Sequence, residues 1–148
     1  MRVPFDTCVL VAAVVSQLPG HTQALACYRK HRGSGRSKKG YCTTLALAEA
    51  YATLTALPLA PRIQPTEAAL LLRRNFTRDL AVLPLSTDDY TAAVERIASL
   101  GLSSGAVYDA LYLIAAERQK CERLFTSNLA DFNRLLSESV ESVEIVAP

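Results

Sequence analysis

Three acidic side chains stand alone in apolar parts of this chain. Each is the only charged residue of a long stretch: Asp6 in residues 3–18, Glu49 in residues 41–61 and Asp109 in residues 97–116. An isolated carboxylate in an apolar interior is costly, so it must be neutralised, paired or bound to a metal. Because no Lys or Arg within those stretches can pair them locally, we expect the three carboxylates to converge on one cation.

Each acid also has a simpler explanation when it is considered alone. Asp6 follows an expected strand and can cap the next helix by accepting hydrogen bonds from free backbone amides. Glu49 and Asp109 lie inside expected helices, where each can be partly exposed or form half of an ion pair. One divalent-metal site explains all three together. Oxygen ligands without His or Cys suit Mg²⁺ or Mn²⁺, which substrate phosphates often complete, so the pattern favours phosphodiester chemistry.

Hydrophobic periodicity and Gly/Pro punctuation predict the elements that position these acids. Strands are expected at residues 2–5, 41–43, 81–85, 123–126 and 143–146. Helices are expected at residues 8–17, 21–31, 45–57, 65–76 and 129–136. Residues 86–89 are expected to cap a further helix that ends at residue 100, and residues 103–105 to lead into a helix that carries Asp109 in its early turns. This alternation predicts a mostly parallel sheet with helices on both faces, in which polar residues gather at the carboxyl ends of the strands.

Composition limits the remaining possibilities. The chain has 148 residues, of which 50% are hydrophobic, so we expect a single domain over residues 1–148. Its four cysteines are widely spaced and have no zinc-binding pattern, which is typical of reduced thiols in a cytoplasmic protein. The apolar stretches around Glu49 and Asp109 each carry a central carboxylate, which makes them poor membrane spans.

Basic residues crowd one segment although the net charge is only +2. The segment contains Arg29, Lys30, Arg32, Arg36, Lys38 and Lys39, with a weaker second group at Arg73, Arg74 and Arg78. Such a segment can follow a nucleic-acid backbone. It can equally be a solvated loop, since no aromatic residue lies within it to stack on bases.

Four short blocks of this sequence resemble the signature blocks of PIN-domain nucleases in order and in spacing. They are Phe-Asp-Thr-Cys-Val-Leu at 5–10, Thr-Thr-Leu-Ala-Leu-Ala-Glu at 43–49, Gly-Ala-Val-Tyr-Asp-Ala-Leu at 105–111 and Thr-Ser-Asn-Leu-Ala-Asp-Phe at 126–132. The resemblance extends over essentially the whole chain, and the compact size is most similar to VapC-type toxins of toxin–antitoxin pairs. It implies a PIN-like three-layer α/β/α fold with a mostly parallel central sheet.

The resemblance also implies roles for individual residues. Asp6, Glu49 and Asp109 match the family's catalytic, metal-binding acids, and Thr7 and Thr126 match its supporting hydroxyl positions. Asn128 stands where the family has a fourth acid, so the further metal ligand is either Asn128 or the nearby Asp131. The implied activity is Mg²⁺- or Mn²⁺-dependent cleavage of RNA, with a small antitoxin as partner and a second copy of the chain in a homodimer.

Two other functions stay open. A PIN-like scaffold without catalytic activity would bind RNA or protein, and the neutral Asn128 favours it. A metal-dependent phosphohydrolase of small substrates would have no need for the basic segment.

Overall fold

The computed structural model describes residues 2–33, 36–136 and 143–148. Along the chain the elements are β1 (Val3–Pro4), α1 (Thr7–Val14), α2 (His21–His31), β2 (Gly40–Thr43), α3 (Thr44–Ala56), α4 (Pro65–Leu72), the π-helical turn η1 (Arg73–Thr77), β3 (Ala81–Leu83), α5 (Thr87–Ser99), α6 (Ala106–Arg118), β4 (Arg123–Phe125), α7 (Leu129–Asn133) and β5 (Glu144–Val146).

The strands lie side by side in the order β3-β2-β1-β4-β5, and every pairing between them is parallel. β1, β2 and β3 form one ladder and β4 and β5 a second. The two ladders meet at a single bridge between Phe5 and Phe125, beside which the Asp6 N–H donates to the Phe125 carbonyl at 2.9 Å. The predicted mostly parallel sheet is therefore confirmed, and its strands end at a common edge.

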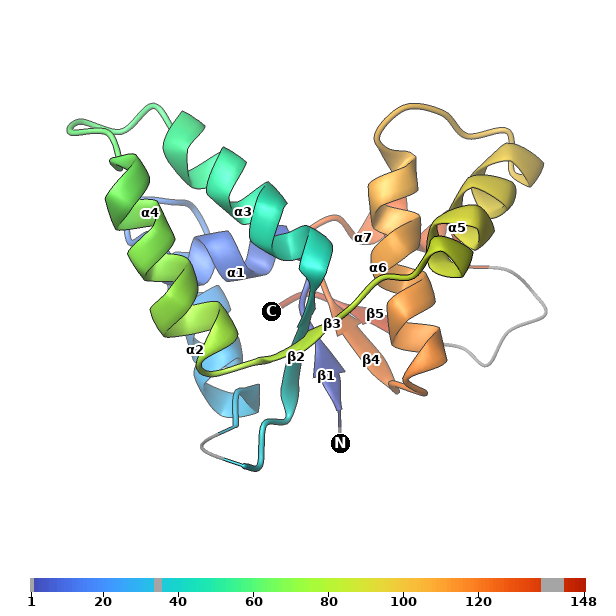
Figure 1. Ribbon diagram of the computed structural model, residues 1–148, viewed down its shortest axis with the longest axis horizontal. Helices are drawn as coiled ribbons and strands as arrows, with labels where there is room; N and C mark the ends of the chain where they lie inside the picture. Colours follow the sequence, from blue (N-terminus) through green and yellow to red (C-terminus); the bar gives the residue numbers. More distant parts are fainter. Residues whose placement is uncertain (1, 34–35, 137–142) are drawn as a thin grey trace.

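Helices cover the sheet from two sides (Figure 1). In that view α1, α2 and α4 lie on one side, α5 and α6 lie on the other, and α3 rises from the end of β2. The core between these layers contains fully buried aromatic and aliphatic side chains, among them Phe5, Leu10, Phe76, Leu111 and Phe132. This arrangement confirms the expected three-layer α/β/α fold.

Three helices end earlier than the sequence predicts. α1 ends at Val14 rather than at residue 17, because Val15 adopts an extended conformation, and α7 ends at Asn133 rather than at residue 136. The helix that begins at Pro65 widens into the π-helical turn η1, where Asn75 Nδ2 donates to the Leu71 carbonyl at 2.9 Å. Side-chain bonds to backbone carbonyls compete with the regular helical pattern.

Polar contacts join α5 to α6, the helix that carries Asp109. Ser86 and Asp89 form a reciprocal capping box at the start of α5, and the buried Asp89 carboxylate also forms an ion pair with Arg118 of α6. Arg96 donates to both carboxylate oxygens of Glu117 at 2.9 and 2.8 Å. These pairs keep the two helices in one register.

Within the described residues, no helix is long and apolar enough to cross a membrane. The cysteines are free thiols.

Replacing Asp89 by Ala is expected to lower the free energy of unfolding by about 2–4 kcal/mol, because the cap is lost and Arg118 loses its buried partner. Urea unfolding measures the change. Asp88→Ala is the matched control, since Asp88 is exposed on the same helical turn. Equal losses in the two variants would contradict the role of the buried pair.

Candidate active site

The three isolated carboxylates line one pocket of about 350 Å³. Asp6 follows β1, Glu49 lies on the second turn of α3, and Asp109 lies on the first turn of α6. α3 begins directly after β2, so the parallel sheet brings Asp6 and the start of α3 to the same edge. Asn128, which follows the end of β4, also lines the pocket. The structure thus brings together three carboxylates that are more than 40 residues apart in sequence.

Asp6 is buried, and its carboxylate is held by side chains rather than by a helix terminus. It occupies the position before α1, but it makes no side-chain capping hydrogen bond, so the simple capping explanation is wrong. Asp6 Oδ2 instead accepts hydrogen bonds from Thr126 Oγ1 at 2.8 Å and from Cys8 Sγ at 2.9 Å. Both hydrogen bonds end on the same oxygen, Oδ2, and together they fix the orientation of the carboxylate.

Glu49 has one satisfied and one unsatisfied oxygen. The Tyr112 hydroxyl donates to Glu49 Oε2 at 3.2 Å, and the same hydroxyl is hydrogen-bonded to Thr7 Oγ1. Glu49 Oε1 is buried and has no hydrogen-bond partner among the described residues. Burial raises the pKa of Glu49, and the negative charge of Asp6 adds to that increase. An orphaned buried oxygen of this kind is what a missing cation would satisfy.

Asp109 is only half-buried, and the charges around it are mostly negative. Its pKa is raised to about 6, first because burial desolvates the carboxylate and then because Asp6, Asp131 and Glu49 repel its charge. The sequence predicts three carboxylates in an apolar interior, but only Asp6 is buried. Glu49 and Asp109 are partly exposed because they border the open pocket.

The position of the fourth acid is occupied by an amide. The Asn128 N–H donates to Thr126 Oγ1 at 2.9 Å, which leaves the Asn128 side chain at the pocket wall. Asp131 lies in the first turn of α7, where its carboxylate is paired with Arg134 at 2.6 Å. Asp131 is near enough to raise the pKa of Asp109, although it does not line the pocket.

Sequence reasoning missed two residues that position the acids, Tyr112 and Cys8. Tyr112 is buried, and burial raises the pKa of its hydroxyl, which therefore stays protonated as a donor. Tyr112 follows Asp109 by three residues, so both side chains lie on one face of α6. This spacing is visible in the sequence and could have identified Tyr112. For Cys8, nothing in the surrounding sequence reveals its bond to Asp6.

The donor set suits a hard divalent cation, since the pocket offers carboxylate, amide and hydroxyl oxygens. The orphaned Glu49 oxygen and the repulsion that raises the pKa of Asp109 both fit a cation between the acids. In the part of the chain that the structure describes, however, no three His, Cys, Asp or Glu side chains are already grouped to hold a metal ion. The Asp6 carboxylate points to its own hydrogen-bond donors instead.

The predicted basic segment lies at the opposite edge of the sheet from this pocket. The Val3 N–H donates to the Lys39 carbonyl at 3.0 Å where β1 begins, whereas Asp6 follows the end of β1. In Figure 1 the α2–β2 connection is accordingly at the bottom, near the N-terminus. Within the segment, Arg32 pairs with Asp79, and Lys38 Nζ donates to the Thr77 and Leu80 carbonyls. These cations therefore do not line the carboxylate pocket.

Comparison with known proteins identifies related chains. A family model described as PIN domain matches residues 4–135. The ribonuclease VapC27 of Mycobacterium tuberculosis is 40% identical over 77 residues, which cover 52% of this chain and 54% of that protein. The chain thus spans about half the length of the curated relative that it matches.

Solved structures share the fold at low sequence identity. The Mycobacterium tuberculosis toxin VapC20, described as cleaving the sarcin–ricin loop, has a TM-score of 0.72 and 12% identity over 94% of this chain and 99% of its own. VapBC2 from Rickettsia felis, bound to a promoter DNA fragment, has a TM-score of 0.65 and 17% identity, and the match covers 99% of this chain and 98% of that chain. The FitAB complex bound to DNA has a TM-score of 0.61 and 14% identity, and the match covers 98% of this chain and 94% of that chain.

Replacing Asp109 by Asn is expected to stabilise the metal-free protein, because it removes a desolvated charge from among other carboxylates. The folded-state pKa of Asp109 is above its unfolded value, so its cost to stability grows as pH rises from about 4 to about 6 and is complete above that. The gain should be larger at pH 7 than at pH 5, and solvent screening limits it to about 1 kcal/mol. Urea unfolding in chelator measures it, with Asp88→Asn as the control. A loss of stability at pH 7 would refute the repulsion.

Proposed function

This chain belongs to the PIN domain family, and we propose that it is a metal-dependent endoribonuclease. The observation that carries the proposal is a pocket lined by three carboxylates, in which one Glu49 oxygen is buried and has no partner among the described residues. The partial match to a ribonuclease of the VapC type supports RNA as the substrate. The Mg²⁺ or Mn²⁺ requirement rests on the chemistry of the oxygen donors.

Asp6, Glu49 and Asp109 would hold the metal, with either Asn128 or Asp131 as a further ligand. When bound, Mg²⁺ or Mn²⁺ neutralises phosphate charge and lowers the pKa of water for hydrolysis of the phosphodiester bond. The protein's own contribution is orientation. Thr126 and Cys8 hold the Asp6 carboxylate, and Tyr112 holds Glu49 through Oε2. Oε1 is left buried and without a hydrogen-bond partner among the described residues.

A toxin of a toxin–antitoxin pair is the biological role that we propose. The fold is shared with VapBC and FitAB structures, and this supports a small antitoxin as the partner. A second copy of the chain in a homodimer is part of the same proposal. We place the protein in the cytoplasm, where its four free thiols would stay reduced, and we propose that residues 1–148 act as a single domain.

A non-catalytic RNA-binding scaffold is the second candidate. It is favoured by the neutral Asn128 and by the lack, among the described residues, of three side chains already grouped around a metal. A scaffold would bind RNA without cutting it, whereas a phosphohydrolase of small substrates would show no salt-dependent RNA binding.

Purified protein is expected to cleave a mixed structured RNA with Mg²⁺ or Mn²⁺ and not with chelator, leaving 5′-phosphate and 3′-hydroxyl ends. Asp6→Asn keeps the size of the side chain and should reduce the rate by more than about 100-fold, since it removes a ligand. Gel analysis of end-labelled products measures this. Cleavage that persists in chelator would refute metal dependence, and folded protein that binds but never cuts RNA would establish the scaffold.

Tyr112→Phe removes only the hydroxyl that orients Glu49, and it is expected to lower the cleavage rate about 10–100-fold. The Mg²⁺ concentration for half-maximal activity should rise as well, because a mobile Glu49 binds the ion less well. Tyr108→Phe is the matched control, since Tyr108 is exposed on the same helix. If both variants have wild-type Mg²⁺ dependence, Tyr112 does not position Glu49.

A further inference from the structure

Charge is divided unevenly along this chain. Residues 1–80 contain eleven of the sixteen basic residues but only four of the fourteen acids. The remaining part, which includes α5, α6 and α7, is therefore acidic, and the carboxylate pocket is itself negative. RNA phosphates are repelled by such a surface, so most of the electrostatic affinity for RNA must come from another face.

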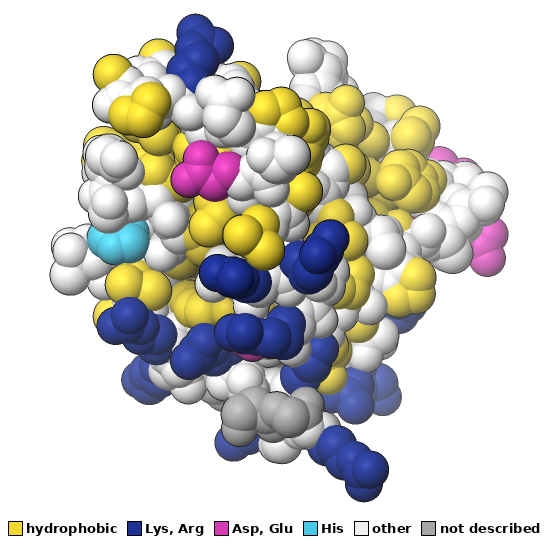
Figure 2. Space-filling view, turned by 60° about the vertical axis from the view of Figure 1, so that its left-hand side comes forward, with side chains coloured by type: hydrophobic (Ala, Val, Ile, Leu, Met, Phe, Trp, Pro, Cys, Tyr) yellow, Lys and Arg dark blue, Asp and Glu magenta, His cyan; other side chains and the backbone are white. Residues whose placement is uncertain are grey.

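A basic hollow of about 390 Å³ provides such a face. It is lined by Arg29, Lys30, Arg32, Gly33, Ser37 and Lys39. Figure 2 shows Lys and Arg side chains gathered over the lower part of this face, with few acids among them. Within the described residues, Arg32 forms an ion pair with Asp79, whereas Arg29, Lys30 and Lys39 have no acidic partner within ion-pair distance. Those three cations are available to an external anion.

The walls of this hollow are closely packed. A Cβ atom on Gly33 would lie 1.9 Å from the Ser37 carbonyl oxygen, so only glycine fits at this position. Basic residues in the last turn of α2 also interact favourably with the negative end of the helix dipole. That effect does not explain Lys39, which lies outside the helix and lines the same hollow.

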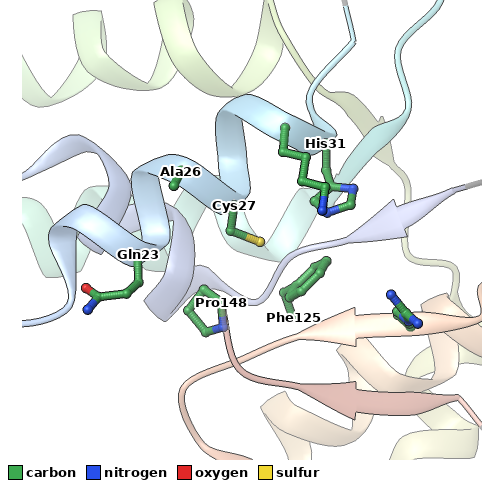
Figure 3. Close-up of a pocket in the computed structure, with 8 residues that line it drawn as sticks. Gln23, Ala26, Cys27, His31, Phe125 and Pro148 are labelled. Carbon is green, nitrogen blue, oxygen red and sulfur yellow. The ribbon is translucent and has the colours of Figure 1, made fainter.

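An adjoining hollow of about 430 Å³ shares Lys30 and has mainly apolar walls (Figure 3). Ala26 and Cys27 of α2 face Phe125 of β4 across it, and Pro148 closes one end. The His31 ring lies 5.1 Å from the Phe125 ring. A space of this size, with aromatic and apolar walls beside a cluster of cations, suits a planar nucleobase.

We propose that the two hollows form a nucleotide-binding site for single-stranded parts of the RNA substrate. A phosphate occupies the basic hollow, the attached base enters the apolar hollow, and Lys30 lies between them. The choice of RNA as the occupant rests on the proposed nuclease function. The basic hollow is at the opposite edge of the sheet from the carboxylates, so only a long RNA can contact both, and a short RNA is cut without it.

The phosphate contacts are tested with the triple variant Arg29→Ala/Lys30→Ala/Lys39→Ala. Its control, Arg29→Lys/Lys30→Arg/Lys39→Arg, keeps the charge. Fluorescence anisotropy in chelator with an unstructured RNA of about 30 nucleotides measures binding without cleavage. The Ala variant should bind at least about tenfold more weakly, with a salt slope shallower by about 2, while the control binds like wild type. An unchanged affinity and slope in the Ala variant would overturn the proposal.

The base contact is tested by filling the apolar hollow. Ala26→Phe should weaken binding of single-stranded RNA by at least about fivefold, because a base contact of about 1–3 kcal/mol is lost. Ala69→Phe, at an exposed position of α4, is the matched control. Wild-type protein should also bind a fully paired RNA duplex more weakly than the single strand. Equal binding of the two Phe variants, or preference for the duplex, would overturn the assignment of a base to this hollow.

Cleavage kinetics distinguish a failure of this binding site from a failure of the nuclease proposal. The triple Ala variant should raise KM for the long RNA while kcat, and cleavage of an RNA of about 4 nucleotides, stay at wild-type values. If wild-type protein cuts no RNA but the Ala variant still loses binding, the binding site stands and the nuclease proposal fails. Cleavage of long RNA with an unchanged KM in the Ala variant would overturn the site.

Discussion

The contact between β1 and β4 is the constraint on which the rest of this structure depends. Phe5 and Phe125 form the single bridge that joins the two ladders of the sheet, and their rings stack with centroids 5.8 Å apart. The next residue on each strand is then Asp6 beside Thr126, which are joined by a 2.8 Å hydrogen bond. Without this contact the strand that carries Asp6 and the strand that leads to Asn128 would not share an edge.

Like charges held close together oppose the fold at this same edge. Asp109 has a pKa raised to about 6, and Glu49 has a buried oxygen without a partner among the described residues, so both groups carry an electrostatic cost in the metal-free protein. The apolar core and the α5–α6 ion pairs offset that cost. A site that destabilises the metal-free protein is what a cation-binding function requires, because binding then relieves the repulsion.

Opposite charges are kept at opposite ends of the sheet. The carboxylates follow the ends of the strands, and the basic hollow lies where the strands begin. A parallel sheet makes this separation possible, since all of its strands run in one direction. The acid pocket would hold the metal and the reacting phosphate, while the basic hollow would supply affinity for the remainder of the RNA.

Much of the fold and the identity of the acids can be predicted from the sequence. Asp6, Glu49 and Asp109 are evident because a lone charge in an apolar stretch needs an explanation, and the parallel sheet follows from alternating strand and helix patterns. Helix ends were predicted less well, because the extended Val15 and the π-helical turn at Arg73–Thr77 depend on local backbone competition. Sequence patterns state which residues are polar or apolar, but they do not give the hydrogen bonds between them.

The sequence by itself determined the acid set, the order of elements and the crowding of basic residues, because these depend on residue type and on spacing along the chain. Only the tertiary structure decided that Tyr112 orients Glu49, that Cys8 contacts Asp6, and that the basic segment lies away from the acids. These are relations between elements distant in sequence or between side-chain directions. They are set by how the helices pack on the sheet, which no local pattern encodes.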